Sequence, residues 1–131
     1  MPSVSLYRAQ KFAKVTATTN HKFPEVADYR HFMFAVHADA VTTGSVRVKA
    51  SFTQDIPDFS LAASSTNSWE YVAIRELSSG TLLAGATGAA VSASTIHKNY
   101  EAELNGAYHV AFEVTFTSGD GISVNAFLRN D

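Results

Sequence analysis

Two stretches decide the fold: residues 46–53, which read VRVKASFT, and residues 108–117, which read YHVAFEVTFT. In the first, Val46, Val48 and Ala50 alternate with Arg47 and Lys49, and the second alternates in the same way. A period of two is typical of a strand with one face in a core and the other in water. Such strands pair antiparallel and stack in layers, so the pattern predicts an all-β domain.

The rest of the chain fits this pattern. Segments rich in β-branched and aromatic residues recur at short intervals, and we expect strands at residues 11–17, 30–38, 45–53, 70–77, 89–94, 97–104, 107–118 and 121–129. About eight strands in 131 residues predict one antiparallel β-sandwich of jelly-roll type, with a barrel as the alternative. The single domain would span residues 1–131, and residues 1–10 would form an N-terminal arm or an ordinary first strand.

The links between these strands carry turn residues. The SGDG at residues 118–121 and the Asn105-Gly106 pair each predict a β-hairpin. Residues 54–68 form an unusually long connection, in which residues 58–65 are the one helix candidate, at most a single turn. Small side chains fill residues 84–94, which predicts close backbone approach in a tight strand or at a subunit contact.

Charge is distributed unevenly. The first 22 residues contain Arg8, Lys11, Lys14 and Lys22 and no acid, whereas the other residues hold six bases (10 − 4) and twelve acids, a net of −6. A basic segment on an acidic body would dock on a neighbouring acidic surface or on nucleic acid. Four charges are too few to identify a nucleic-acid arm, and a formal net charge of −2 argues against a polyanion binder.

No pattern of catalytic or metal-binding residues stands out, so we expect a protein that is not an enzyme and uses no metal or cofactor. His31 and His37 would lie ~20 Å apart on one strand, too far to share a metal ion. Asp55 and Asp58 could bind calcium, but aspartate next to proline is more typical of a turn. The sequence has no Gly-x-Ser-x-Gly elbow and no phosphate-binding glycine loop.

A carboxylate pair and three aromatic side chains complete the candidates. Glu101 and Glu103 are expected on one face of a strand, about 7 Å apart, and such a carboxylate pair could serve glycoside hydrolysis. The simpler interpretation is that both residues lie on the solvent-exposed face of the strand. Trp69, Tyr71 and Phe127 fall on the expected polar faces. There they could stack on sugar rings or form a subunit interface, unless both faces of their strands are covered.

Cysteine is absent, so neither disulfides nor thiol chemistry contribute. We expect no signal peptide, because the first ten residues lack a sufficient apolar region, and no membrane span, because no run reaches ~20 apolar residues.

Several segments of the chain resemble a family of small tailed-bacteriophage proteins that are usually encoded among virion structural genes. The resemblance covers roughly residues 28–131 and rests on strand and turn residues at positions 29–34, 55–60, 65–72, 77–80, 105–110 and 118–127. It implies a β-sandwich virion component, such as a capsid decoration (cement) or head–tail accessory protein, and it carries no active site.

We therefore expect a non-enzymatic virion protein that is assembled in the bacterial cytoplasm. It would act as a homo-oligomer on other virion proteins, the major capsid protein first, with Arg8, Lys11 and Lys14 in an anchoring segment. No specific nucleic acid and no membrane are expected as partners. The alternative is a carbohydrate-binding module that uses Trp69, Tyr71 or Phe127 as a stacking platform for a glycan.

Overall fold

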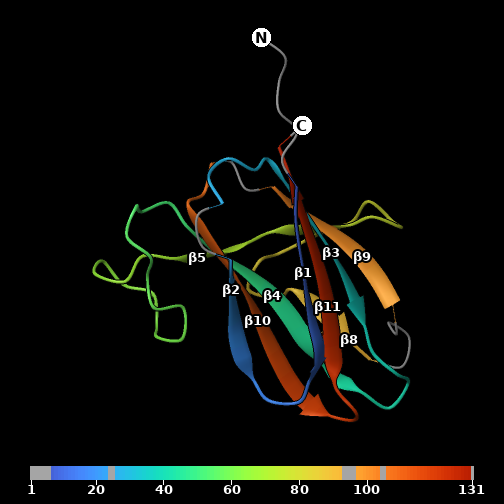
Figure 1. Cartoon of the computed structure of the whole chain (residues 1–131). Coiled ribbons are helices and arrows are strands. Elements are labelled where there is room, and N and C mark those ends of the chain that lie inside the picture. The colour runs from blue at the N-terminus through green and yellow to red at the C-terminus, as the bar shows by residue number, and fades with distance from the viewer. Residues whose placement is uncertain (1–6, 24–25, 93–96, 104–105, 131) are drawn as a thin grey trace.

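The computed structural model describes residues 7–23, 26–92, 97–103 and 106–130, and it folds them as two antiparallel β-sheets packed face to face (Figure 1). Sheet A has the strand order β1-β11-β3-β9-β6-β7, and sheet B has the order β2-β10-β4-β5, with β8 also paired to β4. The strands are β1 (Tyr7–Val15), β2 (Thr19–Phe23), β3 (His31–His37), β4 (Thr43–Ser51), β5 (Glu70–Val72), β6 (Ile74–Glu76), β7 (Leu82–Leu83), β8 (Ala89–Val91), β9 (His97–Glu103), β10 (His109–Ser118) and β11 (Ile122–Arg129).

The prediction of an all-β fold with two antiparallel sheets packed against each other is confirmed. The described residues contain no α-helix, and residues 58–61 form a hydrogen-bonded turn in which Leu61 N–H donates to the Asp58 carbonyl. None of the described segments is a helix long and apolar enough to span a membrane.

The core lies between the sheets and is built from the alternating apolar residues. Phe112 of β10 is at its centre, with ring centroids 4.9 Å from Phe32, 5.0 Å from Phe34 and 6.0 Å from Phe23. All four rings are almost completely buried. Edge-to-face pairs of this kind add roughly 0.5–1.5 kcal/mol each beyond area burial, so this cluster is a main source of stability.

Most connections cross from one sheet to the other. Strands β9 and β11 lie in sheet A and β10 lies in sheet B, so the two hairpins predicted at Asn105-Gly106 and residues 118–121 are wrong. Asn105 itself lies outside the described residues. Residues 118–121 instead turn the chain between layers, with Gly119 and Gly121 at φ angles of 109° and 125° that favour glycine. The successive strands that do pair are β6 with β7, through residues 77–81, and β4 with β5.

Other strand predictions also need correction. The strand expected at residues 70–77 is divided at Ala73, so that β5 pairs in sheet B and β6 in sheet A. Strands β2 and β7 were not predicted. The small residues at 84–92 include β8, and their backbone lies close to other strands of the same chain. A Cβ added to Gly85 would clash with Tyr71, and one added to Gly88 would clash with Arg47. Residues 93 and 94 lie outside the described residues.

The N-terminal basic segment is largely a strand. Residues 7–10 belong to β1 and pair with β11, so they are not a free arm, while residues 1–6 lie outside the described residues. Strands β1 and β2 lie at the ends of their two sheets on the same side of the sandwich (Figure 1). The Phe12 and His21 rings stack there with centroids 4.2 Å apart.

Candidate functional site

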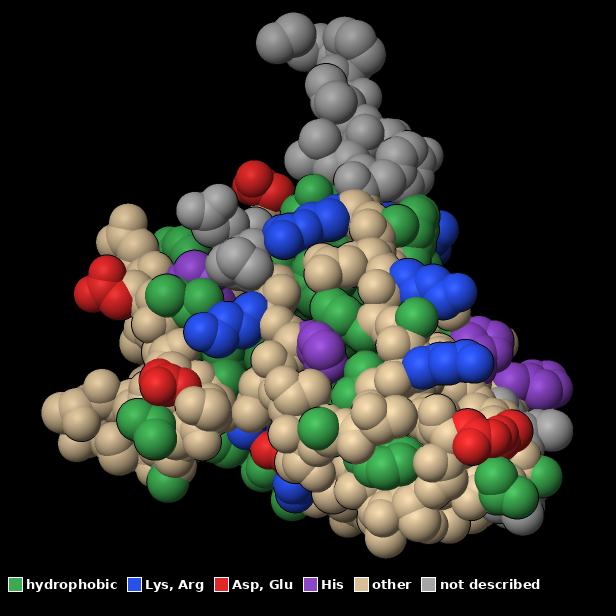
Figure 2. Space-filling model, turned by 60° about the horizontal axis from the view of Figure 1, so that its bottom comes forward, with side chains coloured by type: hydrophobic (Ala, Val, Ile, Leu, Met, Phe, Trp, Pro, Cys, Tyr) green, Lys and Arg blue, Asp and Glu red, His purple; other side chains and the backbone are tan. Residues whose placement is uncertain are grey.

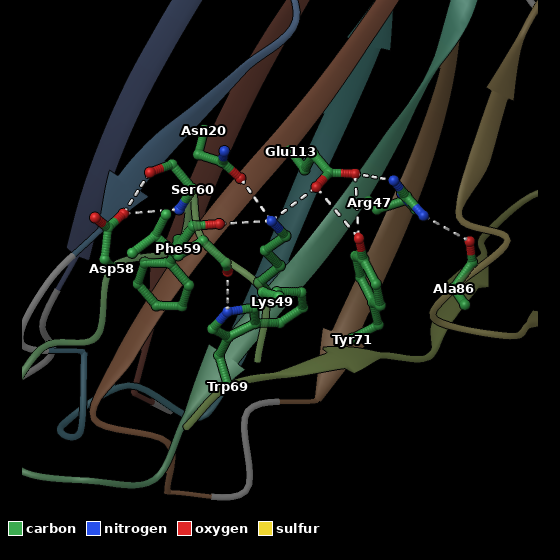
Figure 3. Close-up of polar contacts among 12 residues, drawn as sticks. Asn20, Arg47, Lys49, Asp58, Phe59, Ser60, Trp69, Tyr71, Ala86 and Glu113 are labelled. Carbon is green, nitrogen blue, oxygen red and sulfur yellow. Dashed lines mark hydrogen bonds and ion pairs between the residues drawn. The ribbon is translucent and has the colours of Figure 1, made fainter. Parts of the chain in front are cut away.

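The outward face of sheet B carries a cluster of charged side chains, here called the Lys49 network. The period of two places Arg47 and Lys49 of β4 on this face, and the strand register brings Glu113 of β10 opposite Arg47 and Tyr71 of β5 opposite Lys49. Asn20 of β2 lies opposite Glu113 on the other side. Figure 3 shows these side chains pointing toward one another from four neighbouring strands.

Lys49 and Glu113 form the centre of this network. The Lys49 Nζ donates to Glu113 Oε2 at 2.7 Å, to the Phe59 carbonyl at 2.7 Å and to Asn20 Oδ1 at 2.9 Å. Glu113 also accepts from Arg47 Nη2 and from the Tyr71 hydroxyl. Lys49 is 3% exposed and Glu113 9% exposed, so water hardly reaches either charge. Each charge is instead compensated by the other.

The ionisation of this network follows from its geometry. Burial raises the pKa of Glu113, but the hydrogen bond and charge of Lys49, together with those of Arg47, outweigh it and hold that pKa below its usual range. Burial, and then the negative charge of Glu113, raise the pKa of the Tyr71 hydroxyl. Near neutral pH Glu113 is therefore a carboxylate and the Tyr71 hydroxyl is neutral.

The 54–68 loop covers this network. Phe59 is fully buried and its carbonyl accepts from Lys49, which fastens the loop to the sheet. The Asn67 amide donates to the Asp58 carbonyl and accepts from Asp58 N–H, both at 2.8 Å, and holds the loop closed on itself. In Figure 1 this loop, in green, lies beside β5.

Trp69 and Tyr71 belong to this assembly, and neither lies open on a free sheet face. The Trp69 ring lies over Lys49 Nζ, which is 4.2 Å from its centroid, and its Nε1 donates to the Leu61 carbonyl at 3.0 Å. Arg47 lies over the Tyr71 ring at 4.5 Å. The Trp69 and Tyr71 rings are nearly perpendicular to each other, at 83°, and their faces are occupied by Lys49 and Arg47, so they form no flat platform.

Phe127, the third aromatic candidate, lies on the opposite outer surface, on sheet A. It borders a hollow of about 290 Å³ whose lining is largely apolar and includes Met33, Ala35, Leu77, Asn99, Asn125 and Phe127. The hollow forms because Ala35 is the small middle residue of the cross-strand row Asn125–Ala35–Asn99. Leu77 beside it is 45% exposed, so this face presents apolar surface to the outside.

The structure also places the other acidic and histidine candidates. Asp58 makes a turn by accepting from Ser60 N–H at 2.9 Å, as the turn interpretation of this residue expects. His31 and His37 occupy opposite ends of β3, and His31 lies 3.5 Å from Glu101. The side chain of Glu103 lies outside what the structure describes. Among the described residues no three or more histidine, aspartate or glutamate side chains gather in a way that could hold a metal ion.

A carboxyl pair that sequence reasoning missed connects two loops. Asp39 and Asp120 are hydrogen-bonded, which lowers the pKa of Asp39 and raises that of Asp120. They border a polar hollow of about 750 Å³ together with His37, His97 and Lys14. Because the two aspartates lie far apart in the chain, no local sequence signal could have revealed the pair.

The predicted basic residues lie on the edge strands β1 and β2, with Lys11 on the outward face of sheet A and Lys22 on the outward face of sheet B. Lys11, Lys14 and Lys22 are exposed, and the Arg8 guanidinium lies 5.0 Å from the centroid of the Phe23 ring. Figure 2 brings the lower end of the molecule forward and shows lysine and arginine side chains across its middle, with aspartate and glutamate mainly nearer the margins. Lysines on edge strands also hinder pairing between the edges of two sheets.

Comparison with known proteins gives one similarity of fold. No protein-family model matches the sequence, and no curated protein matches it significantly. The crystal structure of the SPBc2 prophage-derived protein YomS is similar to this chain with a TM-score of 0.67. The alignment covers 98% of this chain and 97% of that one at 11% sequence identity. The likeness shows that the two chains share a fold over nearly their whole length.

Proposed function

We propose that this chain is a non-enzymatic structural protein of a tailed bacteriophage, which decorates the capsid or serves as a head–tail accessory protein. The observation that carries the proposal is the fold shared, over nearly the full length of both chains, with a prophage-derived protein. The resemblance seen in the sequence points the same way. The protein would be assembled in the host cytoplasm and remain with the virion.

The use of the charged side chains supports binding rather than catalysis. Lys49, Glu113 and Tyr71, which have the chemistry of an active site, are joined to one another under the 54–68 loop. A general acid or base must reach its substrate within hydrogen-bonding distance, and these groups are already occupied by structural contacts. The network therefore serves to hold a shaped loop on a rigid sheet.

The β1–β2 side of the sandwich is the surface that we expect to contact an acidic partner, with the major capsid protein as the first candidate. Lys11 and Lys22 are exposed on the two edge strands, and each exposed ion pair contributes only about 0.2–1 kcal/mol. Single contacts of this strength give weak binding. Many copies on one symmetric particle would make the association stable through avidity.

A particle-association experiment tests this function. Virions produced by cells that encode this chain are purified on a density gradient, and the chain is quantified by mass spectrometry in the particle band and in the soluble fraction. We expect many copies per particle. Recovery of the whole chain in the soluble fraction would contradict the proposal.

Charge variants test the surface. The double variant Lys11→Glu/Lys22→Glu should lower particle occupancy at least tenfold, with a strong dependence on salt. Arg30→Glu, which reverses one exposed cation outside β1 and β2, is the control for a single charge reversal and should bind nearly as the wild type does. Equal occupancy for the double variant and the control would show that another surface makes the contact.

A further inference from the structure

We propose that the outer face of sheet A binds a second copy of this chain in a two-fold symmetric dimer. The inference deepens the proposed function, because it names the surface through which copies of the protein would associate. It rests on one cross-strand row of residues, here called the A row: Leu82 of β7, Arg75 of β6, Glu101 of β9 and Met33 of β3.

The A row is self-complementary. Read across the strands, it places an apolar residue, a cation, an anion and an apolar residue side by side. A two-fold axis parallel to the strands and between β6 and β9 would bring Arg75 of each copy onto Glu101 of the other. The same rotation would bring Leu82 of each copy onto Met33 of the other. In an isologous interface every contact occurs twice, so the row would supply two ion pairs and two apolar contacts.

The distances fit this arrangement. With neighbouring strands about 4.8 Å apart, Arg75 and Glu101 are each offset sideways by roughly 2.4 Å from an axis that lies in the interface plane, and Leu82 and Met33 by roughly 7 Å. Leu82 is 62% exposed, which makes it a protruding apolar side chain. The apolar hollow bordered by Met33 and Phe127 lies beside the point where the Leu82 side chain of the other copy would arrive.

The charged pair is available for such contacts. Arg75 is exposed and donates one guanidinium N–H to the Gly80 carbonyl at 3.1 Å, and a guanidinium has five such groups. Glu101 is partly exposed, and its Oε1 lies 3.5 Å from His31 Nδ1. Each side chain can therefore keep its contact within the chain and add one across the interface.

The size of the face limits the affinity. Four strands give a width of about 19 Å, and β9 is about 23 Å long, but β6 has only three residues and β7 only two, so the face narrows on that side. An interface of this extent lies at the small end of specific protein contacts. We therefore expect a weak dimer, with a dissociation constant of about 10–100 μM, that is strengthened where many copies assemble.

Analytical ultracentrifugation of the purified full chain tests the dimer. The wild type should change from monomer to dimer between about 1 μM and 1 mM. Arg75→Glu and Glu101→Arg should each weaken association at least tenfold, because each places like charges opposite one another. Lys22→Glu, an equal charge reversal on sheet B, should leave association unchanged. Circular dichroism verifies that each variant is folded.

Mixing the two variants gives the decisive result. One chain then presents two glutamates and the other two arginines, so an equimolar mixture should form a heterodimer within about threefold of the wild-type affinity. Mixing cannot repair a pair within one chain, so restoration places the contact between chains. A wild type that stays monomeric at about 1 mM, or a mixture that stays as weak as the single variants, would overturn the proposal.

The outcomes are separable from those of the proposed function. The centrifugation experiment needs no particle, and the particle experiment does not measure dimerisation. A protein that dimerises but never joins particles supports this inference and contradicts the proposed function. A protein that stays monomeric but still joins particles contradicts this inference and supports the proposed function. The face of sheet A would then bind another partner, such as a glycan or a different virion protein.

Discussion

Replacement of Glu113 by glutamine should destabilise the protein by about 3 kcal/mol. The change removes the negative charge that faces both Lys49 and Arg47, and Lys49, at 3% exposed, cannot turn to water instead. Removing one partner of a buried ion pair costs about 3–5 kcal/mol. We expect the lower value, because Lys49 keeps its bonds to Asn20 and Phe59 and the Arg47 side chain is 27% exposed.

The assay follows the unfolding with two probes. For 131 residues at about 2.1 cal/mol/K per residue, a loss of 3 kcal/mol corresponds to a fall in Tm of about 11 °C. Circular dichroism reports on the sheets. The fluorescence of Trp69, the single tryptophan, reports on the covered network directly. Coincident transitions in urea would show that the network opens together with the whole fold.

A double-mutant cycle with Lys49→Met isolates the pair. The double variant leaves neither buried charge of the pair, so it should lose clearly less stability than the sum of the two single variants, with a coupling of about 2 kcal/mol. Additivity within about 0.5 kcal/mol would refute the reasoning, as would a loss below about 1 kcal/mol for Glu113→Gln.

The pH dependence supplies an independent check. The pKa of Glu113 is lowered in the folded protein, so its contribution to stability is complete above the unfolded value of about 4.3 and is lost as the pH falls through the folded value. The wild type should therefore lose its advantage over Glu113→Gln in acid.

Three further changes test other parts of the structure. Asn67→Ala should increase proteolysis within residues 54–68, because it removes the bonds that close the loop, with little shift in the urea midpoint of the sheets. Gly121→Ala should cost about 1–3 kcal/mol in urea unfolding, because φ is 125° and the new Cβ would press on the Lys14 backbone. Burial lowers the pKa of His21, so the stability of the wild type should fall as the pH drops below about 6.5, and His21→Phe should remove this fall.

The alternation of side chains indicated the class of fold from the sequence alone. A period of two is a property of each strand and does not depend on which strand pairs with it. Val46, Val48, Phe112 and Val114 are buried as their positions predict. The same reasoning placed Arg47, Lys49, Tyr71 and Phe127 each on the polar side of its own strand, while the strand pairing brings the first three onto one face of sheet B and puts Phe127 on sheet A. It could not show that the loop after β4 covers the first of these faces.

Only the tertiary structure decided which strands are neighbours. An Asn-Gly or Gly-rich link favours a tight turn, but the turn is equally compatible with a crossing between layers, which is how β10 connects to β11. The pairs Lys49–Glu113 and Asp39–Asp120 join residues distant in the chain, and no local pattern records them. The periodicity of side chains is set by each strand alone, whereas the order of the strands depends on the packing of the whole core. The A row exists only because that order brings β7, β6, β9 and β3 together.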